Sequence, residues 1–166
     1  DAGRAAIKTA VEPILSHGCQ TVFPGVTCSL EFPERRGLYD AEIMIDEGGG
    51  VSGNLQENME SGGLCDTVSA SGLLAYVYHE SPAKCVILDE KFKFIGDLAG
   101  RAGEFLRESC YRLGVQAIMV THNPGFAVAA HTLYEIERTG TGSASATCVR
   151  SAFQERAPLV AEVVEL

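Results

Sequence analysis

The sequence predicts an α/β fold, with a mostly parallel sheet flanked by helices and an antiparallel hairpin near the N-terminus. Two short apolar runs, Cys85–Leu88 and Val115–Val120, lie on either side of a helical stretch at Leu98–Leu113. Strand, helix and strand in this order are typical of a parallel pair joined by a right-handed crossover. Short apolar runs between turns also favour strands that are buried on both faces. Alternating apolar side chains over 27–46 indicate the hairpin.

The spacing of apolar residues predicts the N-terminal elements. Helical spacing predicts a helix over Ala5–Ser16 that ends at Gly18, and Pro13 is expected to kink it or to stop it early. Alternation predicts strands at Thr27–Phe32 and Tyr39–Ile45. One face of this hairpin is expected to be in water.

The elements that follow are separated by polar stretches. The Gly- and Ser-rich stretch Gly48–Gly63 has no periodicity and predicts a loop, and helical spacing returns over Asp66–Tyr78. Asp97 is expected to cap the helix of the strand–helix–strand unit, because aspartate is a favoured N-cap residue. Two closing strands are predicted at Leu133–Glu137 and Ala144–Arg150.

Composition limits the classes of protein to consider. The chain has 166 residues, of which 46% are hydrophobic and 21% charged, which fits one globular domain or one lobe of a larger one. The formal charge of −9 argues against a general DNA-binding surface, because phosphate contacts need clustered Lys and Arg. No apolar run is long enough to cross a bilayer, and 1–10 lacks the hydrophobic stretch of a signal peptide. A start without Met suggests a fragment or a processed chain.

Cysteine usage bears on the cellular setting. The chain has 6 cysteines and no C-x-x-C pair, so a zinc or redox motif has little support. Several cysteines lie within apolar runs, where a free cysteine packs as a small hydrophobic side chain. We therefore expect a reducing, intracellular setting and a cytoplasmic protein without a membrane partner. A nucleoid-associated or virus-encoded protein is compatible with this expectation.

An acidic pair, Asp89-Glu90, directly follows the apolar run Cys85–Leu88. The carboxyl end of a parallel strand is where α/β proteins bind ligands. In nucleotide hydrolases one acid at this point holds Mg²⁺, and a neighbouring acid orients or deprotonates the attacking water. A strand that simply runs into a polar loop would show the same pattern.

A second pattern is Ser61-Gly62-Gly63, which precedes a predicted helix. Two glycines let backbone N–H groups approach a ligand closely, and the helix N-terminus adds the positive end of its dipole. The segment could therefore hold a γ-phosphate. An ordinary flexible loop has the same composition.

The third pattern is His122, which follows Val120 and Thr121 at the end of the second apolar run. Because neighbouring parallel strands end at the same edge of a sheet, we expect His122 to lie close to Asp89 and Glu90. An imidazole at this edge can hydrogen-bond a γ-phosphate or the lytic water. A loop histidine without a catalytic task is the alternative.

Taken in order, these patterns resemble the ABC-type ATPase superfamily. The resemblance is strongest to the head domains of SMC, RecF, RecN and SbcC-like ATPases of DNA repair and chromosome maintenance, and it implies a P-loop NTPase-like fold. It implies that Ser61–Gly63 is the signature motif, Asp89 the Walker B acid that holds Mg²⁺, and Glu90 the catalytic base. His122 would be the histidine switch, and Phe94–Asp97 would occupy the D-loop region.

The long coiled-coil members of this family split the head into two lobes, and residues 1–166 resemble the C-terminal lobe. By this resemblance 1–18 is a coiled-coil junction helix, 27–46 the hairpin, and 60–150 the core that carries the signature, Walker B, D-loop and histidine motifs. The sequence contains no G-x-x-x-x-G-K-[ST]. The phosphate loop, or Walker A motif, is therefore expected on a separate N-terminal lobe.

The resemblance also implies Mg²⁺ and ATP as cofactors, ATP hydrolysis, and a homodimer that forms through the heads. DNA would bind to the intact protein, and a nuclease is a further partner that the family suggests. The chain departs from the family pattern at Glu60 and Leu64, which flank the Ser-Gly-Gly motif, and at Lys91, where proline is common after the acid pair.

Two other functions remain open. A helicase or DNA-packaging ATPase is another P-loop motor with a strand that ends in Asp-Glu, but such motors lack the upstream Ser-Gly-Gly and the Thr-His after the next strand. A catalytically inactive scaffold or interaction module is favoured by the missing phosphate loop and the altered signature. ATP-dependent dimerisation of heads would separate the head domain from such a motor. ATP turnover after mixing with a lobe that carries the phosphate loop would separate it from the inactive scaffold.

Overall fold

The structure, a computed structural model, describes residues 2–33, 41–48, 52–55, 61–140 and 142–151. Contacts divide the chain into two compact units, Asp1–Val128 and Ala129–Leu166. The first unit contains all of the predicted site residues. None of the described helices is both long and apolar enough to cross a membrane.

Helix α1 spans Ala2–Val22 and continues through both residues that were expected to end or kink it. Pro13 costs about 3 kcal/mol in a helix interior. Burial of Leu15 and Val22, which lie beyond it, contributes about 1.5–3 kcal/mol each. Gly18 is buried inside the helix, where a Cβ atom would collide with the Ser71 hydroxyl. The expected stop at Gly18 is therefore wrong, because this glycine lets neighbouring helices approach each other.

The predicted hairpin is confirmed and is part of a sheet with a further strand. Strand β1 (Thr27–Glu31) pairs antiparallel with β2 (Glu42–Asp46), and β2 pairs antiparallel with β3 (Ser52–Asn54). Strand β3 lies in the stretch that was predicted to be a loop. Its sequence, Ser-Gly-Asn, has no apolar side chain, so only its pairing with β2 makes it a strand.

A disulfide joins Cys19 in α1 to Cys28 in β1, with the Cα atoms 6.5 Å apart. Both side chains are buried in a small core between α1, the β1–β2 pair and the next helix. Spacing along the sequence does not reveal such a pairing, and the expectation of reduced cysteines is wrong for these two. The other described cysteines are free.

Helix α2 spans Gly62–Glu80, and helix α3 spans Ala99–Leu113. Helix α2 begins four residues before the predicted start at Asp66, because Ser61 caps it. Asp97 does not cap α3, since it lies inside the short 3-10 helix η1, Gly96–Leu98, which leads into α3. The main core forms between these two helices, the end of α1 and the next pair of strands, and includes Leu74 and Phe105.

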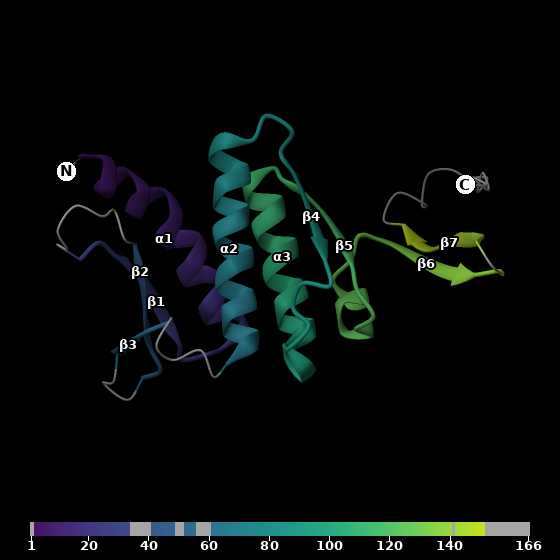
Figure 1. Cartoon of the computed structure of the whole chain (residues 1–166), viewed down its shortest axis with the longest axis horizontal. Coiled ribbons are helices and arrows are strands. Elements are labelled where there is room, and N and C mark those ends of the chain that lie inside the picture. The colour runs from purple at the N-terminus through teal and green to yellow at the C-terminus, as the bar shows by residue number, and fades with distance from the viewer. Residues whose placement is uncertain (1, 34–40, 49–51, 56–60, 141, 152–166) are drawn as a thin grey trace. The chain divides into compact units, whose positions relative to one another are not determined.

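Strands β4 (Cys85–Asp89) and β5 (Gln116–Val120) form the predicted parallel pair, with Asp89 opposite Val120. Figure 1 shows β1–β3 next to α1 and β4 and β5 next to α3, and α1 packs against both α2 and α3. Among the described strands, parallel pairing is confined to β4 and β5.

The β4–β5 pair is buried on its helix-facing side alone, contrary to the prediction of two buried faces. Val86 and Leu88 point into the core. On the opposite side Ile87, Ile118 and Val120 are 67%, 46% and 47% exposed. In the described part of the chain these three side chains stay about half exposed or more, so a face that the sequence predicts to be buried is largely open.

The second unit contains the two predicted closing strands, which are confirmed as an antiparallel pair. Strand β6 spans Thr132–Arg138 and β7 spans Ala144–Ser151, with a register irregularity at Leu133/Tyr134. The short 3-10 helix η2, Pro124–Val128, precedes this unit.

Candidate functional site

The acid pair lies where β4 ends. Asp89 is the last residue of the strand and Glu90 is the first beyond it, and both are exposed. The backbone N–H of Glu90 donates to the carbonyl of Val120 at 2.9 Å, which extends the pairing between the strands by one residue. Glu90 has a φ of 47°, a left-handed conformation that a non-glycine residue adopts at an energetic cost. The neighbouring strand therefore holds the backbone of Glu90 in a turn that its own preference disfavours.

His122 lies beside this acid pair, as the sequence predicts. Its Nε2 atom is 3.5 Å from Oε1 of Glu90, and the side chains of His122 and Glu90 are 95% and 43% exposed. The two side chains come from the ends of β4 and β5, which the parallel register aligns. A carboxylate and an imidazole at this distance can share one proton or one water.

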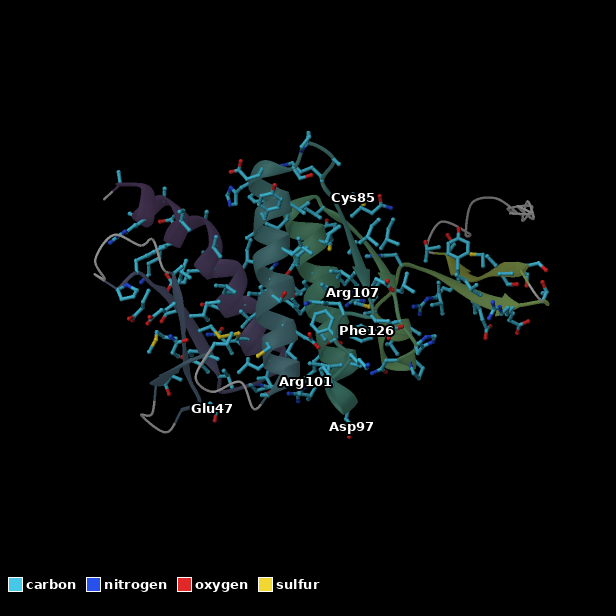
Figure 2. The ribbon with its side chains drawn as sticks, in the orientation of Figure 1. Glu47, Cys85, Asp97, Arg101, Arg107 and Phe126 are labelled. Atoms are coloured by element: carbon cyan, nitrogen blue, oxygen red, sulfur yellow. A yellow bond between two sulfur atoms is a disulfide. The ribbon has the colours of Figure 1, made fainter. Side chains whose placement is uncertain are left out.

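The loops that carry these side chains are packed together. Phe92 is buried with a φ of 66°, and its ring lies 5.6 Å from that of Phe126 in η2. The side-chain amide of Asn123 donates to the carbonyl of Gly96 at 3.5 Å. Phe126 lies beside α3 at the end of the sheet where the acid pair is found (Figure 2). The loop after β4 and the loop after β5 therefore form one packed edge.

Ser61 is the N-cap of α2, and its hydroxyl oxygen accepts a hydrogen bond from the backbone N–H of Leu64 at 3.4 Å. This bond satisfies one of the N–H groups that the start of a helix leaves free. The prediction that the Ser-Gly-Gly segment immediately precedes a helix is thus confirmed in part, because Gly62 and Gly63 already belong to α2.

Gly62 and Gly63 pack tightly against the D-loop region. A Cβ atom on Gly62 would lie 2.9 Å from Cβ of Phe94, and one on Gly63 would lie 3.2 Å from Cδ1 of Ile95. The sequence analysis assigned these glycines to ligand contact. In the structure, Phe94 and Ile95 lie so close to α2 that a side chain at position 62 or 63 would collide with them. Packing alone therefore requires glycine at both positions.

A pocket of about 520 Å³ opens where the signature segment meets the D-loop region. Ser61 supplies its one hydroxyl, and apolar side chains supply most of the rest of the lining. The lining residues are Phe23, Ser61, Gly62, Gly63, Phe94, Ile95 and Leu98.

The predicted site residues thus fall into two groups. Glu90 and His122 are in contact at the sheet edge where Asp89 ends β4, whereas Ser61–Gly63 borders the pocket. In the described part of the chain, the ion contact that links these regions is between Lys91 Nζ and Asp66 Oδ1, at 3.9 Å. Lys91 is one of the residues at which the chain departs from the family pattern. No sequence pattern indicated that Asp66 would contact it.

Asp89 fits the metal role that the family implies. Mg²⁺ in nucleotide hydrolases takes one or two carboxylates, and waters and phosphate oxygens complete its shell. The exposed carboxylate of Asp89, at the end of a strand that is buried on one face, could supply such a ligand. No group of three or more His, Cys, Asp or Glu side chains among the described residues could hold a metal by itself.

The parallel strand ends, the helix α2 that Ser61 caps, and the packed loops after β4 and β5 define the class of fold. The chain has a fold similar to that of SMC head domains. Neither a protein-family model nor a curated protein matches the sequence.

Three solved structures illustrate the similarity. A structure from work on ATP-driven dimerization and DNA-stimulated activation of SMC ATPases is 17% identical, with a TM-score of 0.70, and 92% of each chain is covered. The Smc head bound to the C-winged helix domain of ScpA is 16% identical, with a TM-score of 0.71. The match covers 91% of this chain and 45% of that one. The SMC head domain from Thermotoga maritima is 24% identical, with a TM-score of 0.62, and 86% of this chain covers 48% of that one. The chain therefore spans less than half of the second and third structures.

Proposed function

We propose that this chain is the C-terminal lobe of an ATP-hydrolysing, SMC-like head. The observation that carries the proposal is the 3.5 Å contact between His122 and Glu90 next to Asp89. Asp89, Glu90 and His122 all lie where the strands of a parallel pair end, and nucleotide-binding α/β folds hold their ligand at this edge.

Each residue takes a role that its position supports. Asp89 would hold Mg²⁺, and the metal would neutralise charge on the β- and γ-phosphates when nucleotide is bound. Glu90 would accept a proton from the attacking water, and His122 would donate a hydrogen bond to the γ-phosphate. The positive φ of Glu90 supports this assignment, because strained backbone conformations cluster at functional sites.

The phosphate loop would come from an N-terminal lobe that covers the open face of the β4–β5 pair. Parallel sheets are found with both faces covered, yet Ile87, Ile118 and Val120 are exposed. A lobe that packs on these side chains would bury them and place its phosphate loop near the acid pair. A larger parallel sheet of the P-loop type would form in the process.

Two such heads would dimerise around ATP. Ser61–Gly63 of one head would contact the γ-phosphate that the other head holds, and the N-terminus of α2 would supply the positive dipole end. ATP-driven dimerization is stated for one of the SMC ATPases that this chain resembles, as is activation by DNA. The acidic charge of this chain (−9 in total) argues against a general DNA-binding surface on this lobe, so DNA would bind to other parts of the intact protein.

The cellular role would then be DNA repair, recombination or chromosome maintenance inside the cell, in which a nuclease is one candidate partner. Hydrolysis would separate the heads, so that ATP would act as a reversible clamp.

The direct test is to combine this chain with a lobe that carries the phosphate loop and to measure Mg²⁺-dependent ATP turnover. We expect turnover from the mixture, and Glu90→Gln should abolish turnover while leaving ATP-bound dimers that accumulate on a sizing column. Absence of both turnover and ATP-dependent dimers would overturn the proposal and favour the inactive scaffold. Normal turnover by Glu90→Gln would show that Glu90 is not the base.

A further inference from the structure

The contact between Lys91 and Asp66 differs from an ordinary surface ion pair. Lys91 Nζ lies 3.9 Å from Asp66 Oδ1, and the side chains are 29% and 18% exposed. The second oxygen of this carboxylate, Oδ2, is buried and has no hydrogen-bond partner among the described residues. A carboxylate that has lost much of its water depends on a nearby cation more than an exposed one does. By comparison, Lys8–Glu12 and Arg112–Glu108 each lie within one helix and are more exposed.

The two residues belong to the two halves of the candidate site. Asp66 lies in the first turns of α2, three residues after Gly63, and Lys91 directly follows Glu90. The backbone around Lys91 has little freedom, because Glu90 and Phe92 both have positive φ values and Phe92 is buried. A movement of the start of α2 would therefore pull on the residue next to the proposed base.

We propose that the Lys91–Asp66 pair couples the two ATP sites of a head dimer. The inference rests on the proposed function. In such a dimer, Glu90 of one head acts on the ATP bound to that head, while Ser61–Gly63 of the same head contacts the ATP bound to the other. When the signature segment engages a γ-phosphate, α2 shifts, and the ion pair transmits this shift to the position of Glu90. Lys91 and Asp66 are thus positioning residues, and neither of them touches the nucleotide.

Coupling between sites predicts cooperative hydrolysis. A dimer with two composite sites should show a Hill coefficient for ATP between 1 and an upper limit of about 2, the number of sites. Replacing Lys91 by Gln, or Asp66 by Asn, removes one charge of the pair with little change in volume. We expect the Hill coefficient to fall toward about 1 in each variant, and kcat to fall roughly tenfold, within the range seen for coupled residue pairs.

The experiment uses the complete head, in which this chain is combined with the lobe that carries the phosphate loop. ATP hydrolysis is measured over a range of ATP concentrations for the wild type, the two single variants, and the exchanged pair Asp66→Lys with Lys91→Asp. The exchanged pair and Lys91→Arg should each recover cooperativity, because both restore a cation opposite a carboxylate. Arg112→Gln is the matched control, since it removes one cation from an exposed ion pair in α3 and should leave the Hill coefficient unchanged.

The outcomes separate this inference from the proposed function. If the wild type hydrolyses ATP cooperatively and the single variants do the same, the coupling is wrong and the proposed function stands. If the variants lose turnover and the exchanged pair and Lys91→Arg do not restore cooperativity, coupling through this ion pair is also wrong. If the wild type neither hydrolyses ATP nor dimerises with it, the proposed function fails and the coupling fails with it.

Discussion

At the level of single residues, the packing of Phe94 against α2 requires glycine at position 62. Because a Cβ atom at this position would meet Cβ of Phe94 at 2.9 Å, Gly62→Ala forces the D-loop region away from α2. We expect a loss of about 1–3 kcal/mol in the free energy of unfolding, typical of overpacking. Gly72→Ala in the same helix is the control, since nothing lies within 4 Å of its Cβ position, and it should stabilise the helix by about 1 kcal/mol. Urea unfolding of both variants checks this, and equal effects would show that α2 does not pack against Phe94 as described.

Cys110 gives a pH dependence that can be attributed to one thiol. Burial raises the pKa of the Cys110 thiol from 9.0 to about 11, because the charged thiolate is poorly solvated there. Its contribution to stability is complete below pH 9 and declines as the pH rises through about 11, since the unfolded chain releases the proton first. Unfolding measured between pH 8 and 11 should show this fall in the wild type and less of it in Cys110→Ala. Identical pH profiles for the two proteins would refute the assignment.

At the level of elements, a disulfide links helix α1 to strand β1 covalently. It joins residues 9 apart in sequence, and a closed loop of this length stabilises a fold by about 2–3 kcal/mol in the chain-entropy account. Adding a reductant should lower the free energy of unfolding by a similar amount, which is measured as a lower midpoint of denaturant unfolding. The double variant Cys19→Ala with Cys28→Ala should be insensitive to reductant, and a wild type that is equally insensitive would show that the bond is not formed in solution.

For the whole molecule, the open face of the β4–β5 pair is the surface that we propose binds the N-terminal lobe. Ile118→Asp places a charge on this face, and because Ile118 is 46% exposed the chain itself should still fold. Binding to the lobe that carries the phosphate loop should weaken by about 100-fold or more, since burying an unpaired carboxylate adds to the lost apolar burial. Calorimetric titration of the two lobes measures this. Tyr111→Asp is the control, because Tyr111 lies on α3 and is 85% exposed, and unchanged binding by Ile118→Asp would exclude this face as the interface.

Much of the fold could be predicted because it follows local patterns. Apolar periodicity located the helices and most strands, and the strand–helix–strand order predicted the parallel pairing of β4 and β5. That pairing in turn predicted the proximity of Glu90 and His122. These features depend on residue spacing and chain connectivity, both of which are visible in one sequence. The roles assigned to the site residues stay predictions.

The errors occurred where distant parts of the chain decide the outcome. Gly18 has the sequence signature of a helix end, and contacts with Ser71 and Phe105 keep it inside α1. Strand β3 exists through pairing with β2 alone. Ile87 has the sequence pattern of a buried strand residue, and its exposure depends on what packs on the sheet. Each case depends on contacts between elements and not on the spacing of residues within one element.

Residue spacing alone is enough to give the order of the motifs and to predict that Glu90 and His122 lie close together at one edge of the sheet, because parallel strands bring successive loop starts to one side. Tertiary structure alone decided the disulfide between Cys19 and Cys28, the tight fit of the signature glycines, and the contact between Lys91 and Asp66. These features depend on distances between side chains of different elements. Residue spacing along the chain holds no information about such distances until the elements are packed together.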